Sequence, residues 1–547
     1  MVRGWWHDAV FYQVYPRSFA DGDGDGVGDL PGLLTRLPHL RDLGVDAIWL
    51  SPFYRSPMVD AGYDVADPRD VDPLFGTLAD ADRVFARAHE LGLAVLVDVV
   101  PNHTSRDSAW FTAALATPPG SVERSRYLFR DGRGAGGEEP PNNWRSQFGG
   151  PAWTRITEAD GCPGQWYLHL YSPAQPDLNW RNLEVRCEYL SILRFWLDRG
   201  VDGFRIDVAH GLVKALGLPD VPPGVPQGWE GRLRHRLPYW DQPEVHDVYR
   251  TWRRLLDSYA GVDTGSGRHG RIAVAEAWLP RAERSSAYLR PGELHQAFDF
   301  PFLLAGWDPV RLRAAIDDAL AATAAVGAAP TWVLANHDVV RPVSRFGGGT
   351  LGLARARAAL LLELALPGAA YLYQGDELGL PEVEDLPDEL RRDPVFLRSD
   401  GRVRGRDGCR VPLPWAGEAA PFDFTSGEAA WLPQPASWAA LTVAAQRHDP
   451  DSTLALCRTA LRIRRTHPAL GAAAAGRGLT WAEDELAPNV LAFTRAPGFG
   501  CAVNMGKAPT RVPLTGPLLL ASGPVEHFGT GHLDLPPNTA AWWSTAP

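Results

Sequence analysis

The chain has few cysteines, no apolar leader and no excess of basic residues. Its five cysteines are scattered, odd in number and without the spacing of metal ligands (Cys162, Cys187, Cys409, Cys457 and Cys501). Cysteines in this pattern indicate reduced thiols and no disulfide framework. The first residues lack the apolar core of a signal peptide, and no later run is long enough to span a bilayer. We therefore predict a cytoplasmic protein.

The charge balance bears on the partners. The formal net charge is -11, from 54 basic and 65 acidic residues, which argues against nucleic acid or an anionic membrane as a ligand. A small neutral substrate fits better, bound by a monomer or a small homo-oligomer. Twenty-one tryptophans favour a carbohydrate, because aromatic faces stack on sugar rings. A length of 547 residues exceeds one ordinary domain and predicts a large catalytic unit with attachments.

Short apolar runs alternate with amphipathic helical patterns over the first two-thirds of the chain. This rhythm is typical of βα units around a parallel sheet, and eight strands are the number in a closed (β/α)₈ TIM barrel. The expected strands are Val10–Tyr15, Ala47–Leu50, Ala94–Val99, Gly203–Ile206, Ile272–Ala275, Gln296–Phe300, Thr331–Leu334 and Ala369–Tyr373.

Two connections are too long for plain loops. We predict an α/β protein whose barrel comprises residues 1–103 and 176–470, with an inserted domain at 104–175 after the third strand. A long charged loop at 375–435 follows the eighth strand; it could be a solvated flap, but βα loops of a barrel face the active site. Residues 471–547 change to short strands with turn signals, which predicts a C-terminal antiparallel β domain.

Arg205 and Asp207 lie two residues apart in an expected buried strand. Side chains alternate along a strand, so both groups lie on one face. A guanidinium beside a carboxylate favours the ionised form that a nucleophile requires. An isolated pair of this kind is more often structural. Further carboxylates, Glu276 and Asp338, follow other apolar strands, and another strand runs into His103. Polar groups at several strand ends are the layout of a barrel active site.

Four segments together resemble the signature blocks of the α-amylase superfamily, glycoside hydrolase family 13. These are Asp98 to Ser105, Gly203 to His210, the strand ending at Glu276, and Asn336 to Asp338; Gln175 to Asn179 resembles an additional block. The resemblance implies that Asp207 is the nucleophile, Glu276 the general acid/base and Asp338 a carboxylate that stabilises the transition state. A retaining glycosidase needs two carboxyl groups about 5–5.5 Å apart, and strand ends around one barrel mouth can hold them.

The same resemblance implies substrate-binding residues. His103 and His337 would donate hydrogen bonds to ring hydroxyls, Asp98 would support Arg205, and Tyr63 would stack under the first sugar. Considered alone, each histidine fits a core or capping role better than a binding role.

Asp60 and Arg341 resemble the pair that closes the pocket around the terminal glucose in α-glucosidases. An ion pair there would block chain extension and give attack from the non-reducing end. Asp60 could also be an ordinary loop acid.

A Gly/Asp run places oxygen ligands at alternate positions, the spacing that wraps a hard cation. The resemblance implies one structural Ca²⁺ or Mg²⁺, and no organic cofactor; the alternative is a turn without metal. The implied ligands are Asp21, Asp23, Asp25, the Val27 carbonyl and Asp29.

The expected function is therefore a retaining, exo-acting α-glucosidase on short α-glucosides, with transglucosylation if a sugar resolves the intermediate. Val208 resembles oligo-1,6-glucosidases, whereas the segment from Gly405 to Trp415 departs from their pattern and favours α-1,4 linkages. Sucrose- or trehalose-active enzymes remain rivals. From another class, a non-catalytic carbohydrate-binding or scaffold protein could keep the barrel, although such relatives lose the catalytic carboxylates.

Overall fold

A closed barrel of eight parallel strands occupies the centre of the computed structural model, which describes residues 4–228, 237–471, 478–482, 487–525 and 531–545. The strands follow one another around the barrel in the order β11-β10-β9-β5-β2-β1-β13-β12, and a parallel bridge from Phe298 to Thr331 joins the two ends. The predicted (β/α)₈ fold is confirmed. The strands are β1 (Val10–Val14), β2 (Ala47–Leu50), β5 (Ala94–Val99), β9 (Gly203–Ile206), β10 (Ile272–Ala275), β11 (Gln296–Ala297), β12 (Thr331–Val333) and β13 (Ala369–Tyr373).

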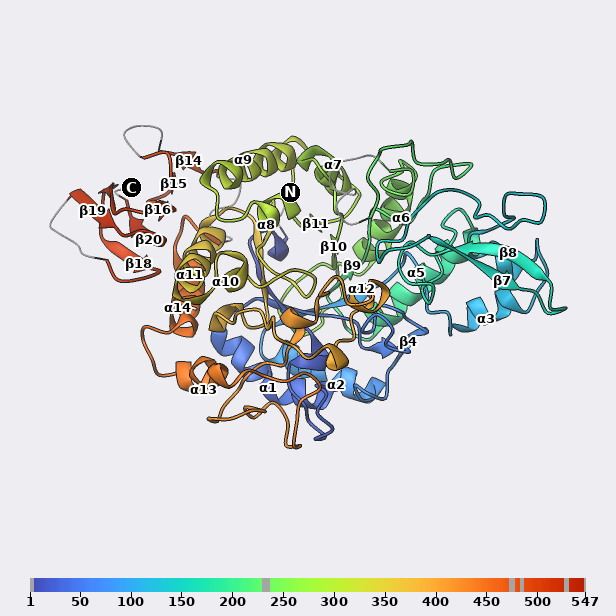
Figure 1. Ribbon diagram of the computed structural model, residues 1–547. Coiled ribbons are helices and arrows are strands. Elements are labelled where there is room, and N and C mark those ends of the chain that lie inside the picture. The colour runs from blue at the N-terminus through green and yellow to red at the C-terminus, as the bar shows by residue number, and fades with distance from the viewer. Residues whose placement is uncertain (1–3, 229–236, 472–477, 483–486, 526–530, 546–547) are drawn as a thin grey trace.

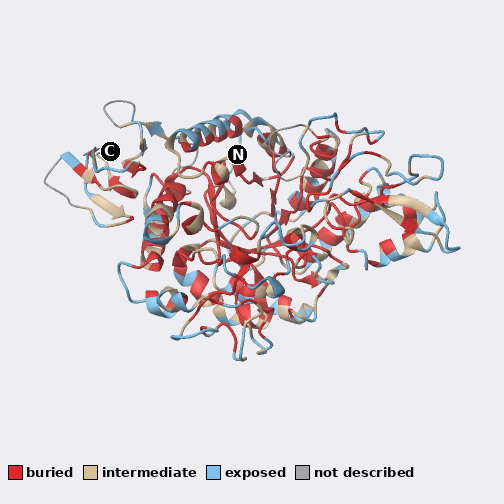
Figure 2. Cartoon of the chain, in the orientation of Figure 1, coloured by how far each residue is buried: buried red, intermediate tan, exposed pale blue. Residues whose placement is uncertain are grey.

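The barrel strands are buried on both faces, since side chains fill the interior and helices cover the outside (Figures 1 and 2). This explains why they read as continuous apolar runs rather than as alternating patterns. Helix α2 (Leu78–Glu90) starts where Thr77 and Asp80 form a reciprocal capping box. The longer helices are α1 (Leu30–Leu43), α2 (Leu78–Glu90), α5 (Leu183–Asp198), α6 (Val245–Ser258), α9 (Pro309–Ala325), α11 (Gly349–Ala365) and α14 (Thr453–Thr466).

The sixth barrel strand is shorter than its sequence predicts. The apolar run was expected to remain extended to Phe300, but β11 ends at Ala297. The Asp299 side chain accepts a hydrogen bond from the Phe302 amide and so caps α8 (Phe300–Leu304), with Pro301 in its first turn. A capping residue followed by proline starts a helix even inside an apolar run.

The connection after β5 contains a three-stranded sheet of its own, in the order β6-β8-β7, at the right-hand end of Figure 1. Its strands are β6 (Phe129–Arg130), β7 (Trp153–Thr157) and β8 (Pro163–Leu168). The connection after β13 contains α12 (Pro394–Arg398) and crosses to this region, because Arg398 Nη2 donates to the Gly149 carbonyl at 2.6 Å. The two long connections therefore meet above the carboxyl ends of the strands.

The chain ends in antiparallel strands on the opposite side of the barrel (Figure 1). Trp542 Nε1 donates to the Leu361 carbonyl at 3.2 Å, and Arg495 Nη1 donates to the Ala365 carbonyl at 2.8 Å, so these strands are fastened to α11. The strands are β14 (Thr480–Trp481), β15 (Val490–Arg495), β16 (Phe499–Asn504), β17 (Thr510–Leu514), β18 (Leu518–Ala521), β19 (Gly531–Leu535) and β20 (Thr539–Ser544); the sequence did not predict β14, β17 or β19.

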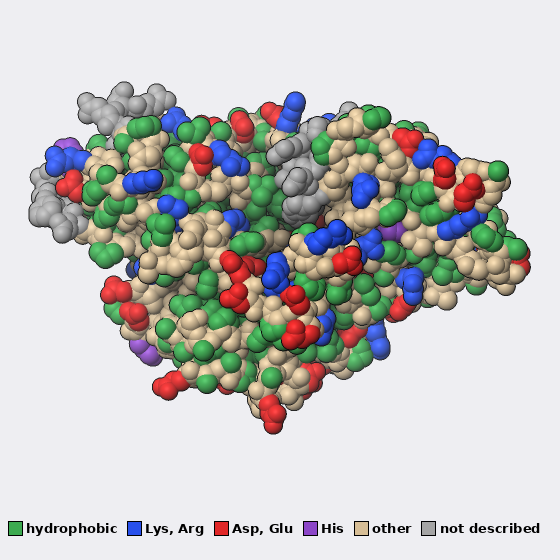
Figure 3. Space-filling model, in the orientation of Figure 1, with side chains coloured by type: hydrophobic (Ala, Val, Ile, Leu, Met, Phe, Trp, Pro, Cys, Tyr) green, Lys and Arg blue, Asp and Glu red, His purple; other side chains and the backbone are tan. Residues whose placement is uncertain are grey.

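All five cysteines are free thiols, in agreement with the absence of a disulfide framework. Within the described residues, none of the helices is both long enough and apolar enough to cross a membrane. On the face seen in Figure 3, acidic and basic side chains lie in small mixed groups.

Candidate active site

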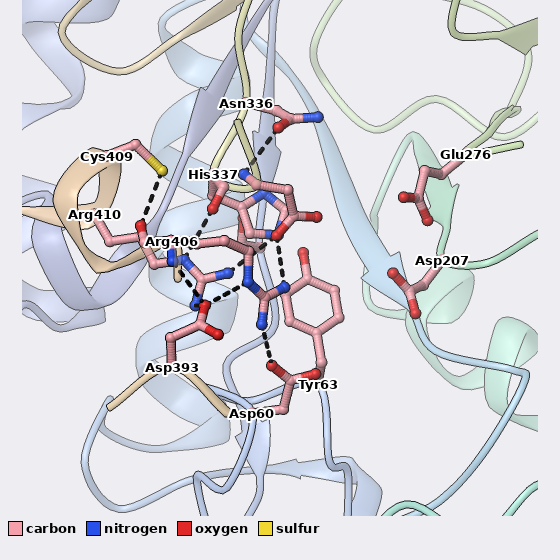
Figure 4. Close-up of polar contacts among 12 residues, drawn as sticks. Asp60, Tyr63, Asp207, Glu276, Asn336, His337, Asp393, Arg406, Cys409 and Arg410 are labelled. Carbon is pink, nitrogen blue, oxygen red and sulfur yellow. Dashed lines mark hydrogen bonds and ion pairs between the residues drawn. The ribbon is translucent and has the colours of Figure 1, made fainter. Parts of the chain in front are cut away.

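A narrow cavity opens at the carboxyl ends of the barrel strands. The strand-end residues predicted from four separate segments all reach it, although hundreds of residues separate some of them in sequence. The cavity is lined by Asp60, Tyr63, His103, Phe148, Tyr171, Asp207, Val208, Glu276, His337, Asp338 and Arg406. Figure 4 shows Asp207 and Glu276 together on one side, with Asp60, Arg406 and Arg410 on the other.

Arg205 joins the carboxylates at the base of this cavity. Its Nη1 donates to Asp98 Oδ1 at 2.8 Å and to Asp207 Oδ1 at 2.7 Å, while its Nη2 lies 3.3 Å from Glu276 Oε2. The predicted Arg205–Asp207 pair and the support from Asp98 are thus present. Asp207 and Glu276 therefore contact the same guanidinium from adjacent barrel strands.

The pKa of Asp207 is shifted in the opposite direction to the one expected from Arg205 alone. Burial raises the pKa of the Asp207 carboxyl well above its ordinary value; Arg205 lowers it, and the charges of Glu276 and Asp98 raise it further. The expectation considered only the guanidinium, but one cation here faces three carboxylates. Burial likewise raises the pKa of Asp98 to about 6. Groups this close titrate as a coupled set.

The residue that follows Asp207, Val208, has an unusual backbone conformation. Val208 has a φ of 45°, a left-handed conformation that is strained for a β-branched residue. In this conformation the Val208 amide donates to Glu276 Oε2 at 2.8 Å. The other oxygen, Oε1, accepts from Trp278 Nε1 at 2.6 Å. Both Glu276 oxygens are therefore held by donors, and the strained turn sets the orientation of Glu276 relative to Asp207.

Asp338 is ionised by a pair of arginines from the loop after β13. Its Oδ1 accepts from Arg406 Nη1 at 2.9 Å and from Arg410 Nη2 at 3.0 Å. Burial acts to raise the pKa of Asp338, but the positive charges around it outweigh burial and hold the pKa well below its ordinary value. Burial lowers the pKa of His337 to about 3, so this ring is neutral and the two guanidinium groups are the neutralising charges.

The predicted Asp60–Arg341 ion pair is wrong; Arg406 takes that place. Arg406 Nη2 donates to Asp60 Oδ1 at 2.8 Å (Figure 4). Because Arg406 Nη1 donates to Asp338, the guanidinium bridges these two carboxylates. Arg341 is fully buried outside the cavity, and its Nη groups donate to the carbonyls of Gln374 at 2.9 Å and Cys409 at 2.8 Å. It turns away because Pro342 starts a helix directly after it, and it anchors the base of the loop that carries Arg406.

The remaining predicted substrate residues lie on the cavity wall. Tyr63 donates to Asp98 Oδ2 at 3.0 Å and stacks on His337, with ring centroids 5.1 Å apart. His103 Nε2 lies 3.1 Å from the Tyr63 carbonyl, and burial lowers the pKa of His103 to about 4. Gln175 Nε2 donates to Asp60 Oδ2 at 3.0 Å and lies 3.1 Å from His103 Nε2. Two neutral imidazoles and an amide here favour an uncharged, hydroxyl-rich ligand.

A buried lysine below the cavity was not predicted. Lys214 Nζ lies 2.7 Å from Asp177 Oδ2, donates to Asn102 Oδ1 at 2.7 Å and donates to the Gly211 carbonyl at 2.6 Å. Burial lowers its pKa, but the Asp177 carboxylate opposes that change. This cation fastens the ends of the inserted domain, which begins after Asn102 and ends near Asp177, to the barrel.

Only some of the implied metal ligands converge. Oxygen atoms of Asp21, Asp23 and Asp29 lie within 4.8 Å of one another. Asp25 is outside this group, and its Oδ1 accepts from the Val27 amide at 2.8 Å. Burial raises the pKa of Asp29 to about 6, which shows that its charged form is poorly stabilised by the protein alone. Three converging carboxylates of this kind fit a hard divalent cation.

The residues that sequence reasoning missed all come from irregular segments. Arg406 and Arg410 belong to the charged run in the loop after β13, Gln175 opens a segment noted for its family pattern, and Phe148 and Tyr171 belong to the inserted domain. The run of arginines was a usable signal, because one of them had to balance Asp60 and Asp338. The spacing of residues did not predict the path of this loop in three dimensions. It therefore did not predict which arginine contacts Asp60 and Asp338.

Comparisons with known proteins agree with this geometry. A family model described as "Alpha amylase, catalytic domain" matches residues 13–473. A probable alpha-glucosidase of Rhizobium meliloti (strain 1021) is 39% identical over 480 residues, which are 86% of this chain and 84% of the relative. An oligo-1,6-glucosidase of Parageobacillus thermoglucosidasius is 34% identical over 500 residues, 85% of this chain and 84% of the relative. The crystal structure of the alpha-glucosyl transfer enzyme XgtA superposes with a TM-score of 0.88 at 37% identity, covering 99% of this chain and 100% of that one.

Proposed function

Because the chain belongs to the α-amylase catalytic-domain family of glycoside hydrolases, we propose that it is an exo-acting α-glucosidase. It would release α-D-glucose, with retention of configuration, from the non-reducing end of short α-glucosides. The observation that carries the proposal is the single cavity in which Asp207 and Glu276 contact the same guanidinium opposite the Asp60–Arg406–Asp338 bridge.

The first half-reaction follows from the arrangement of the two carboxyl groups. An Asp207 oxygen attacks the anomeric carbon while Glu276 gives its proton to the glycosidic oxygen, so the leaving sugar departs neutral. A covalent glucosyl–Asp207 intermediate remains. In the second half-reaction Glu276 takes a proton from water, the resulting hydroxide attacks the anomeric carbon, and Asp207 leaves as a carboxylate. Arg205 contacts both carboxyl groups and offsets the charge as it moves between them.

The ion pairs of Arg406 support attack at the chain end. Arg406 closes the far side of the cavity by joining Asp60 and Asp338, with its Nε held by Asp393 at 2.5 Å. A guanidinium fixed at three carboxylates leaves no passage for a sugar chain beyond the terminal glucose. The pocket therefore fits one sugar ring and not the interior of a polymer.

Arg406→Ala is expected to lower kcat/KM for maltose about 100-fold, because it leaves Asp60 and Asp338 without their shared cation. Activity on a maltoheptaoside blocked at its non-reducing end should fall much less, or rise. The two rates are measured side by side, with Arg402→Ala as the control from the same loop, since its side chain is 79% exposed. Equal losses on both substrates would contradict the closing role of Arg406.

Product analysis on maltose, isomaltose, sucrose, trehalose and maltotriose tests the proposed substrate class. We expect glucose from maltose and terminal cleavage of maltotriose, with α-glucose appearing first in an NMR time course. The alternative, an α-1,6 preference, is favoured by Val208, whose side chain lines the cavity next to Asp207. Cleavage of isomaltose alone would establish that alternative, and glucosyl transfer products at high maltose would show that a sugar resolves the intermediate.

A non-catalytic carbohydrate-binding role would leave all five sugars intact. The presence of all three carboxylates in one cavity speaks for catalysis.

We further propose that Asp21, Asp23 and Asp29 hold a structural Ca²⁺ in the loop before α1. The Asp29 side chain also accepts from the Gly22 and Gly32 amides, so it joins the ion to the start of the helix. The loop lies away from the strand-end carboxylates and would stabilise the fold without taking part in the reaction.

Ca²⁺ is expected to raise Tm by about 2–5 °C at pH 7.5, in a thermal unfolding assay with and without chelator. The pKa of Asp29 is raised to about 6 in the metal-free fold, so its contribution to stability is present at low pH and lost as pH rises through 6. Ca²⁺ should restore that loss above pH 6 and have little effect at pH 4.5. Asp23→Ala should abolish the response, whereas Asp42→Ala, an exposed acid, should keep it. A response of equal size at both pH values would refute the assignment.

A further inference from the structure

The ring of His337 is held from both faces in the cavity wall. Tyr63 stacks on one side at 5.1 Å between centroids, with 5° between the planes, and Tyr15 stacks at 5.8 Å and 19°. Trp49 meets the ring edge-on at 6.1 Å. Only 1% of His337 is exposed. The orientation of the ring is therefore fixed by packing, and its hydrogen-bonding character depends on which nitrogen carries the hydrogen.

Gln13, near the carboxyl end of β1, contacts Nδ1 of the His337 ring, whereas Nε2 is the nitrogen that faces Asp338. Its Nε2 lies 2.7 Å from His337 Nδ1 and 3.1 Å from Ser51 Oγ. An amide nitrogen only donates, so Nδ1 must accept and cannot itself carry a hydrogen.

The orientation of the Gln13 amide decides which His337 nitrogen carries the hydrogen. As placed, both N–H groups have acceptors, and only the carbonyl Oε1 is buried without a partner in the part of the chain that the structure describes. Rotation by 180° would place Oε1 beside His337 Nδ1 and Ser51 Oγ, and Nδ1 would then have to carry the hydrogen. The orientation in the structure, which gives both N–H groups an acceptor, instead requires an unprotonated Nδ1.

The hydrogen is then on Nε2, the nitrogen nearer Asp338. Nε2 lies 3.6 Å from Asp338 Oδ1, which is beyond hydrogen-bond distance. Burial also keeps the ring neutral at pH 7, with the pKa lowered to about 3. Among the described residues, His337 thus presents a single N–H with no acceptor at hydrogen-bond distance.

We propose that Gln13 is a positioning residue that fixes the Nε2–H tautomer of His337, so that this N–H donates to a hydroxyl of the bound sugar next to Asp338. The proposal rests on the proposed function, because it requires a sugar in the cavity. It assigns a role to a barrel-interior residue that does not itself line the cavity.

The tautomer is tested directly by NMR of the full chain with ¹⁵N-labelled histidine, with the His337 signals assigned by their loss in His337→Ala. At pH 7 we expect an unprotonated Nδ1 and a protonated Nε2. A protonated Nδ1, or an even mixture of the two forms, would overturn the proposal. This measurement needs no substrate, so it is independent of whether the glucosidase assignment is correct.

The role of Gln13 is tested by a double-mutant cycle on kcat/KM for maltose. We expect Gln13→Met to lose about tenfold and His337→Ala about 100-fold, with the double variant no worse than His337→Ala alone. A merely structural role for Gln13 would instead give losses that multiply, which would refute the proposal.

Tyr371→Phe provides the matched control, because it removes another buried hydrogen bond of the barrel interior, 2.7 Å from Tyr371 Oη to Gln296 Oε1. It should leave kcat/KM nearly unchanged and be additive with His337→Ala. If Gln13→Met does not fold, Gln13→Asn, which keeps the amide but shortens its reach, replaces it in the same cycle. Wild-type chain with no activity on any α-glucoside would refute the proposed function but not the tautomer.

Discussion

Asp207→Asn should lower kcat/KM for p-nitrophenyl α-glucoside by at least about 10⁴-fold, equivalent to about 5.5 kcal/mol of lost transition-state stabilisation. An amide cannot form the glucosyl ester, so the covalent route is closed, while the rest of the cavity is unchanged. The assay is release of p-nitrophenol by wild-type and variant chains at matched concentration. Equal rates would remove Asp207 from the role of nucleophile.

Asp207→Asn is expected to lose activity without losing thermal stability. Burial and the neighbouring carboxylates make the ionised form of Asp207 unfavourable, as its raised pKa shows. The neutral amide avoids that cost, so Tm of Asp207→Asn should equal or exceed that of the wild-type chain. Thermal unfolding of both proteins decides this. A large fall in Tm would mean that the lost activity reports a damaged fold rather than a missing nucleophile.

Glu276→Gln should separate substrates by their leaving groups. For maltose, whose leaving sugar needs a proton, kcat/KM is expected to fall about 10³-fold, within the usual range for loss of a general acid. For a 2,4-dinitrophenyl α-glucoside, whose leaving group departs without a proton, the fall in kcat/KM should be less than about tenfold. The ratio kcat/KM reports only the first half-reaction, so the missing base in the second step does not affect the comparison.

Gln keeps the size of Glu276 but preserves only one of its two accepting oxygens. Trp278 Nε1 and the Val208 amide both donate to Glu276, so one of these donors will face an amide nitrogen in the variant. Some loss on every substrate is therefore expected. A loss of the same size for both leaving groups would show that Glu276 positions groups but does not supply the proton.

The barrel strands could be predicted from the sequence because the signals for each strand lie within a few consecutive residues. Seven of the eight expected strands agree within one residue at either end, since continuous buried apolar runs and the polar residues that end them are written side by side. The exception, β11, was overridden by the cap at Asp299. In a parallel barrel all strand ends face one rim, so locating Asp207, Glu276 and Asp338 at strand ends was enough to bring them together.

The ion pair that closes the cavity could not be predicted from such local signals. Arg406 lies 346 residues from Asp60 and in a loop without regular periodicity, so no spacing rule predicts their contact. Arg341 is closer in sequence to Asp338 and was the natural choice, yet Pro342 turns the chain and buries it elsewhere. The direction of the Asp207 pKa shift was not predicted for a related reason, because burial and the sharing of Arg205 depend on surroundings that sequence neighbours do not reveal.

The sequence by itself determined the barrel, the three carboxylates and the sugar-binding character of the chain, because these depend on strand-end positions that the topology makes equivalent. Only the tertiary structure decided which arginine closes the pocket, how one guanidinium is divided among three acids, and which nitrogen of His337 carries its hydrogen. Those features depend on contacts between irregular segments and buried polar groups, whose distances are set by packing and not by their order along the chain.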